Sequence, residues 1–230
     1  KKNNLNEIIY KNDVLKINDD QQIISGEIFV DKNLIFEKPV KILSGTTFFI
    51  DEGVDIIFKN KVEAIGEKNN KIKFISKSKN PWGTIAIIGK KTSGSELSFL
   101  EISNGSGSYS NQFYYTSMLS IHNTKNIKLS NINFDQNHKF DDMLHVIYSS
   151  NVNLENLIFN NANGDAIDID MSKNILIENS EFNNSNNDGI DLMESDVIIK
   201  NVKISDSKDK AISIGEYSKA KIISSELEGN

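Results

Sequence analysis

The chain has 230 residues, no Cys and a net charge of −6 at pH 7, and its length fits a single domain without a linker. The negative charge argues against a nucleic-acid partner, which needs a clustered basic face, and the lack of Cys excludes disulfides and thiolate metal sites. No apolar run approaches the roughly 20 residues of a membrane span, so we expect no membrane insertion.

Residues 1–22 are polar, with scattered apolar side chains and no repeat. They are predicted to form a leading strand or an N-terminal cap, which solenoid proteins need. Over residues 23–58, short β-branched strands alternate with Gly, Asp and Asn turns, as in IISGEIFV, NLIF, VKIL, TTFFI and VDIIF. The coil over residues 85–119 is longer because it carries the insertion 103–117, which we expect to lie on the surface.

The repeat is clearest after residue 120, in IKLSNINF, VNLENLIF, ILIENSEF and VIIKNVKI. Each segment carries an Asn at the same place. The resulting column runs through Asn131, Asn156, Asn179, Asn201 and Ser224, at steps of 25, 23, 22 and 23 residues. Asn tolerates left-handed backbone angles and bonds to nearby backbone, so this column is predicted to mark a corner, with amides hydrogen-bonded from coil to coil.

Two apolar columns accompany the Asn column and are predicted to point inward. The first consists of Ile127/Leu129, Val152/Leu154, Ile175/Ile177 and Val197/Ile199, and the second of Phe134, Phe159, Phe182, Ile204 and Leu227. A repeat of about 22–25 residues made of short strands predicts an all-β fold, a single-stranded parallel β-helix with one coil per repeat. Residues 23–230 would form this one domain. The last coil is expected to be incomplete, so an adjoining domain or a partner should cover its open edge.

Acidic residues gather in the strands MLHV, AIDI, GIDL and AISI, where one residue lies between inward-pointing neighbours. The outward column is His145, Asp168, Asp191 and Ser213, and three residues earlier stand Asp142, Asp165, Asp188 and Lys210. Parallel strands lie about 4.8 Å apart, and two carboxylates at that separation repel by about 1 kcal/mol even in water. A bound cation, a raised pKa of one carboxyl group, or a nearby amide or Lys would reduce this repulsion. Alternatively, the carboxylates are solvated, and the residues are then ordinary turn and strand positions.

The chain resembles the right-handed parallel β-helix proteins of the pectate-lyase-like superfamily. The resemblance rests on the stacked Asn turns, on PWGTIAI followed by SELSFLEISNG, and on the NDGIDL repeat, and it covers about residues 23–230. The opening part is similar to β-helix regions of bacterial secreted or surface proteins, which implies an extracellular or cell-surface location. Because this superfamily includes lyases, hydrolases, epimerases, adhesins and binding modules, the fold alone does not select an activity.

The first functional hypothesis is a module that interacts with carbohydrate or serves as a structural or adhesive scaffold. It requires no cofactor, but Ca²⁺ would suit oxygen ligands, here Asp142, Asp165, Asp170 and Asp188. The partner would be a polysaccharide or glycan. Flat aromatic faces pack on sugar rings, so the candidate binding residues are Trp82, Tyr114 and Tyr115.

The alternative is a polysaccharide-degrading enzyme, a hydrolase or a lyase, with Asp165, Asp168, Asp191 and His145 as catalytic candidates. A resemblance to polygalacturonase-type hydrolases implies an inverting mechanism with two carboxyl groups about 6.5–9.5 Å apart. The sequence lacks the Asn-Thr-Asp, Gly-His-Gly and Arg-Ile-Lys segments of those enzymes. It also has no Arg, which excludes the commonest base of the lyases. His122 and His138 are predicted to lie in turns, without a functional role.

Overall fold

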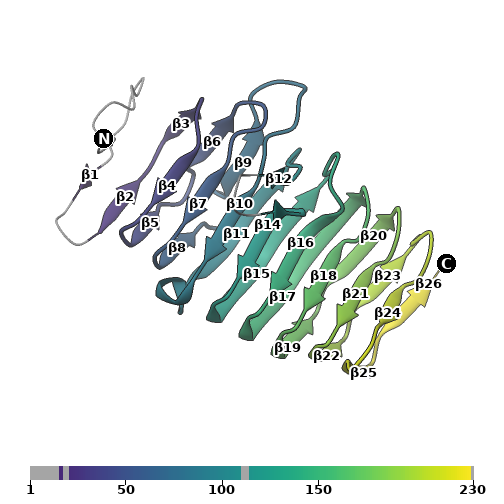
Figure 1. Ribbon diagram of the computed structural model, residues 1–230. Coiled ribbons are helices and arrows are strands. Elements are labelled where there is room, and N and C mark those ends of the chain that lie inside the picture. The colour runs from purple at the N-terminus through teal and green to yellow at the C-terminus, as the bar shows by residue number, and fades with distance from the viewer. Residues whose placement is uncertain (1–15, 18–20, 110–113, 229–230) are drawn as a thin grey trace.

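The computed structural model describes residues 16–17, 21–109 and 114–228. It is an all-β parallel β-helix, a stack of coils that runs from the N-terminal to the C-terminal end of the molecule (Figure 1). Among the described strands, only the pairs β1–β2 and β12–β13 are antiparallel. The predicted leading segment lies mostly outside the described residues. Its described strand, β1 (Lys16–Ile17), pairs with β2 (Gln22–Ile24).

The coils form two large sheets. The eight-stranded sheet consists, in spatial order, of β4 (Leu34–Phe36), β7 (Ile56–Phe58), β10 (Ile85–Ile88), β14 (Ser117–His122), β16 (Asp142–Ile147), β18 (Ile167–Asp170), β21 (Ile190–Met193) and β24 (Ile212–Ile214). Each strand pairs in parallel with the strand one coil before and one coil after it. Residues far apart in sequence are therefore brought into register along the axis.

The sixteen-stranded sheet covers the remaining sides of each coil. One path through it contains β1, β2, β5 (Val40–Ile42), β8 (Val62–Ile65), β11 (Glu96–Ser103), β15 (Lys125–Asp135), β17 (Ser150–Ala162), β19 (Lys173–Glu178), β22 (Asp196–Lys200) and β25 (Lys219–Ile223). The other strands are β3 (Glu27–Val30), β6 (Thr47–Ile50), β9 (Ile72–Ser76), β20 (Glu181–Ser185), β23 (Lys203–Ser205) and β26 (Glu226–Glu228).

Two small elements complete the fold. A short 3₁₀ helix, η2, spans Lys90–Thr92, and the hairpin β12 (Ser108–Tyr109) and β13 (Tyr114–Tyr115) lies within the insertion. No helix in the described part of the chain has the length and apolar character needed to cross a membrane.

The predicted Asn column forms a left-handed corner in every coil that it passes through. The φ angles are 55° at Asn131, 52° at Asn156, 52° at Asn179, 51° at Asn201 and 49° at Ser224. In β15 and β17 the corner bends one long strand, and in the later coils it separates two strands. The amide of Asn201 donates to Oδ1 of Asn179 over 2.7 Å, so the predicted ladder is confirmed at that step.

Replacing Asn179 by Ala should lower the free energy of unfolding by about 1–2 kcal/mol, because an ordinary L-residue is strained at positive φ and the ladder bond is lost. Asn179→Gly should cost less, since Gly adopts this conformation readily. Denaturant unfolding of both variants measures the difference. Equal stability of Asn179→Ala and the wild-type protein would contradict the role assigned to the corner.

The core is filled by inward columns that keep their register. Phe159 stacks on Phe134 and Phe182, with ring centroids 4.5 and 5.0 Å apart, and all three rings are buried. Leu227 joins the predicted column, since it pairs in register with Ile204, but it is 47% exposed because no following coil within the described residues covers it.

A second ladder, built from Ser and Thr hydroxyls, was not predicted. The backbone N–H of each residue donates to the hydroxyl of its counterpart in the next coil, from Ser149 to Ser172 and from Ser172 to Ser195, both over 3.0 Å. It holds the corner that follows the eight-stranded sheet. The outer face of that sheet is thereby presented as a regular surface.

Candidate functional site

The predicted outward column is confirmed on the eight-stranded sheet. Neighbouring strands place five residues in register, in the order Ser120, His145, Asp168, Asp191 and Ser213. For the first four residues the neighbours on the strand are buried apolar residues, and strand alternation therefore turns the column toward the outer face. In β24, Ile212 is partly buried and Ile214 is exposed. The column is nevertheless shielded over its first three residues: Ser120 is completely buried, and the side chains of His145 and Asp168 are only 8% and 20% exposed.

His145 is the centre of a polar cluster. Its Nε2 lies 3.4 Å from Oδ2 of Asp170 and 3.6 Å from Oδ2 of Asp168. On the other side of the ring, Nδ1 lies 3.1 Å from Oγ1 of Thr116, which also hydrogen-bonds the carboxyl group of Asp142. The imidazole is therefore held between the sheet and the end of the insertion.

Thr116 is a site residue that sequence reasoning missed. It immediately precedes β14 and reaches the next coil, where it contacts both His145 and Asp142. Its position gave no periodic signal, because the insertion before it interrupts the repeat.

Three potential ligand groups converge in this cluster. Asp142, His145 and Asp168 each offer an atom, and these atoms all lie within 4.8 Å of one another. Burial, reinforced by the charge of Asp168, raises the pKa of Asp142 well above its ordinary value. Asp142 is 2% exposed. The site therefore contains carboxyl groups that are costly to ionise without a counter-charge.

Asp168 is the most unusual carboxyl group on the outer face. Burial raises its pKa to about 7; the His145 ring opposes this rise, and the charges of Asp170 and Asp191 add to it. Its Oδ1 atom is buried and has no hydrogen-bond partner. A carboxyl group in these surroundings is poised to hold a proton, a cation or a ligand group.

The residues of the second acidic column form hydrogen bonds from one coil to the next. Oδ1 of Asp165 accepts the backbone N–H of Asp188 over 2.6 Å, and Oδ1 of Asp188 accepts that of Lys210 over 2.7 Å. Burial raises the pKa of Asp165 to about 6, and the hydrogen bond from the N–H of Asp188 counteracts part of this rise. One oxygen of each carboxyl group is thus engaged with the next coil. Of the four predicted Ca²⁺ ligands, the structure brings only Asp142 and Asp170 to the His145 cluster.

Asp191 lies in the outward column one coil beyond Asp168, next to the cluster. Its Oδ1 accepts the backbone N–H of Leu192 over 2.9 Å.

His122 was predicted to lie in a turn, and that prediction is wrong, whereas its lack of a functional role stays a prediction. It is the last residue of β14, and its ring contacts the rings of His145 and Tyr115, with centroids 5.2 and 5.3 Å apart. Burial lowers the pKa of His122 to about 3, so the ring stays neutral. His138 lies in a loop, 3.2 Å from Oδ1 of Asn104, outside the cluster.

The predicted sugar-stacking surface needs correction. Trp82 is completely buried and donates its Nε1–H to the backbone oxygen of Ser103 over 2.8 Å. Tyr115 is 1% exposed, so neither ring can stack on a sugar. Tyr114 is exposed and makes an edge contact with Tyr109. Tyr109 was not among the predicted binding residues.

Asp55 fastens the insertion to the eight-stranded sheet. Its Oδ2 accepts the hydroxyl of Ser108 over 2.7 Å, and its Oδ1 accepts the backbone N–H of Thr84 over 3.0 Å. A Cβ on Gly83 would lie 2.0 Å from the same carboxylate, so Gly is needed there. The anchor holds β12 and β13 beside the site, and through them Thr116.

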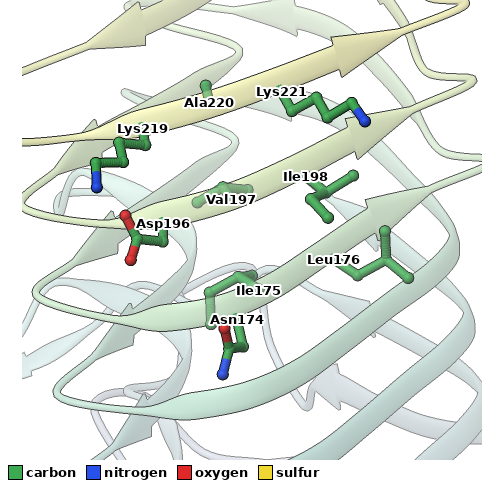
Figure 2. A pocket seen from close by; sticks show the side chains of 9 residues that line it. All are labelled: Asn174, Ile175, Leu176, Asp196, Val197, Ile198, Lys219, Ala220 and Lys221. Atoms are coloured by element: carbon green, nitrogen blue, oxygen red, sulfur yellow. The ribbon is translucent and has the colours of Figure 1, made fainter.

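A shallow groove of ≈ 450 Å³ lies elsewhere, over β19, β22 and β25 of the sixteen-stranded sheet (Figure 2). Leu176 and Ile198 form its apolar floor, and Lys219, Lys221 and Asp196 lie along it. It contains neither a His nor paired carboxylates. The candidate site is therefore the His145 cluster, on the other sheet.

The coils and their parallel sheets define the protein as a parallel β-helix. Residues 142–230, which include Asp142, His145 and Asp168, match the family described as right handed beta helix region, in agreement with the predicted resemblance. No curated protein matches the chain in sequence.

Two solved structures are similar in fold. The periplasmic alginate epimerase AlgG is 11% identical, with 92% of this chain and 79% of that one covered and a TM-score of 0.46. The enzymatically active domain of tailspike protein 2 of bacteriophage CBA120 is 13% identical, with a TM-score of 0.46. That alignment covers 90% of this chain but only 38% of the tailspike chain.

Proposed function

We propose that the protein binds a carbohydrate polymer along the outer face of the eight-stranded sheet. The observation that carries this proposal is the in-register column from His145 to Ser213, which offers imidazole, carboxylate and hydroxyl groups. These groups hydrogen-bond sugar hydroxyls, and they repeat once per coil, about 4.8 Å apart. A polymer that lies along the axis would therefore meet one polar group for each coil. The proposal includes an extracellular or cell-surface location, where such polymers occur.

The insertion supports this proposal because it borders the column. Tyr109 and Tyr114 are exposed on its hairpin, and the Asp55 anchor holds the hairpin to the sheet. Tyr side chains combine a flat apolar face with a hydroxyl group, which suits a sugar ring. The face and the hairpin together would form the binding surface.

The binding test uses neutral, uronate-containing and amino-sugar polysaccharides with the wild-type protein and two variants. Asp191→Asn removes a column carboxylate outside the His145 cluster. It should weaken binding by about 10-fold or more, because a hydrogen bond to a charged group contributes about 1.5–3 kcal/mol. Glu181→Gln, on an exposed position of the other sheet, is the matched control and should bind like the wild-type protein. Absence of binding to every glycan, or equal weakening in both variants, would contradict the proposal.

A second candidate function, cleavage of the bound polymer, is favoured by one observation. The carboxyl group of Asp168 lies beside the imidazole of His145 and has a buried oxygen without a partner. A carboxyl–imidazole pair is a common acid–base arrangement in enzymes. The test is release of new reducing ends from the same glycans, which should disappear in Asp168→Asn and persist in Glu181→Gln. Product formation that survives Asp168→Asn would exclude this residue as the catalytic group.

A further inference from the structure

We propose that Asp142, His145 and Asp168 form a binding site for one divalent transition-metal ion. Each residue offers one ligand atom, and the three atoms lie within 4.8 Å of one another. Metal–ligand bonds of about 2.0–2.2 Å place ligand atoms roughly 3–4 Å apart, so the cluster has only to contract slightly around an ion. The inference does not require the proposed glycan binding, although it uses two residues of the same column, His145 and Asp168.

The orientation of the imidazole matches that of a metal-binding His. A ligating ring normally bonds a polar partner through its second nitrogen, which fixes its tautomer and its direction. Here Nδ1 of His145 lies 3.1 Å from the hydroxyl of Thr116. The opposite nitrogen, Nε2, is thereby directed at Oδ2 of Asp168 and of Asp170, 3.6 and 3.4 Å away.

One carboxyl oxygen of the cluster also lacks a hydrogen-bond partner, although Thr116 bonds the carboxyl group of Asp142. Oδ1 of Asp168 is a fully buried atom without a hydrogen bond. Asp142 is 2% exposed, and the ion pairs of Asp168 and Asp170 in the described part of the chain are with His145 alone. The chain contains no Arg that could neutralise them. A divalent cation would supply both the missing partner and the missing charge.

The donor set selects the class of metal. Ca²⁺ takes six to eight oxygen ligands, whereas this cluster combines one nitrogen with a few oxygens. Asp165 and Asp188 cannot readily complete an oxygen cage, because their Oδ1 atoms bond backbone amides. Imidazole and carboxylate together suit Zn²⁺ and its neighbours in the first transition row. Asp168 is 20% exposed, so an ion can reach the cluster from the outer face. Three protein ligands would leave one position of a tetrahedral site open.

The experiment uses the full chain, freed of metal with a chelator and titrated with Zn²⁺, Co²⁺ and Ca²⁺. Calorimetry gives stoichiometry and affinity, thermal unfolding gives the shift of the midpoint, and the visible spectrum of bound Co²⁺ reports the coordination geometry. We expect one Zn²⁺ or Co²⁺ per chain and a higher unfolding midpoint. Asp142→Asn and His145→Gln should each weaken binding at least 100-fold. Glu181→Gln, on an exposed position of the other sheet, should bind these metals as the wild-type protein does.

Three results would overturn this inference: no saturable binding of Zn²⁺ or Co²⁺, binding that survives in both cluster variants, or a preference for Ca²⁺ that His145→Gln leaves unchanged. If His145→Gln does not fold, as judged by circular dichroism, Asp168→Asn provides the same comparison, because it removes a ligand together with a buried charge. Metal binding without glycan binding would uphold this inference and contradict the proposed function, so the two fail separately.

Discussion

Asp168→Asn is expected to make the metal-free protein more stable above pH 7. In the folded protein the pKa of Asp168 is raised from its ordinary value of 3.8 to about 7. The folded state therefore binds more protons than the unfolded state between these two values, and the stability of the wild-type protein falls as the pH rises through this window. The difference of about three units between the two pKa values corresponds to a loss of about 4 kcal/mol in the free energy of unfolding. Asn does not ionise, so the variant does not lose this stability. Denaturant unfolding from pH 4 to pH 8, in the presence of a chelator, measures the effect.

The comparison needs a carboxyl group from ordinary surroundings. Glu181→Gln, on an exposed position of β20, should change the free energy of unfolding by less than about 0.5 kcal/mol at every pH. The expectation for Asp168 is wrong if its Asn variant and the wild-type protein keep a constant difference from pH 4 to pH 8. Addition of Zn²⁺ should reverse the order at pH 8, because only the wild-type protein retains all three proposed ligands.

Trp82→Ala is expected to lower the free energy of unfolding by about 3–5 kcal/mol, as found for large aromatic side chains in protein cores. The ring is completely buried and its N–H bonds the backbone of Ser103. It also underlies the start of the insertion, since a Cβ on Gly105 would lie 2.7 Å from the indole ring. Chemical unfolding measures the loss, and proteolysis of the insertion reports its loosening.

An exposed aromatic residue of the same insertion provides the control for Trp82. Tyr109 is 76% exposed, so Tyr109→Ala should leave stability within about 0.5 kcal/mol of the wild-type value. If Tyr109 belongs to the glycan-binding surface, its loss should weaken glycan binding instead. A Trp82→Ala protein that is fully stable but binds glycan poorly would restore Trp82 to the predicted stacking role.

The periodic pattern of the sequence was sufficient to predict most of the fold. The Asn column could be predicted because its residue type, spacing and local chemistry agree, and the structure places all five members at positive φ. Strand alternation was likewise sufficient to predict the outward column through His145 and Asp168, because a buried neighbour on each side leaves one direction for the residue between them. Leu227 shows the limit of this reasoning: register determines where a residue stands, whereas burial depends on a further coil above it.

The parts of the site that escaped prediction lie where the repeat is interrupted or where side chains rotate. Thr116 and the ring contacts of His122 depend on the path by which the insertion returns to the sheet, and no period describes that path. Asp165 and Asp142 occupy equivalent places in adjacent coils, yet one bonds a backbone amide and the other approaches His145. That difference follows from local geometry that residue type alone does not reveal.

The ladders of Asn, Ser and Thr have a consequence for how such a protein can change in evolution. Each coil is bonded chiefly to the coil before and the coil after it, and the corner residues that shape it do not take part in the His145 cluster. Gain or loss of a whole coil beyond β21 would therefore lengthen or shorten the molecule and leave the cluster intact. The column itself already carries Ser at both ends and His or Asp in the middle. The residue type at this position can thus differ from coil to coil, which adds or removes a reactive side chain without changing the fold.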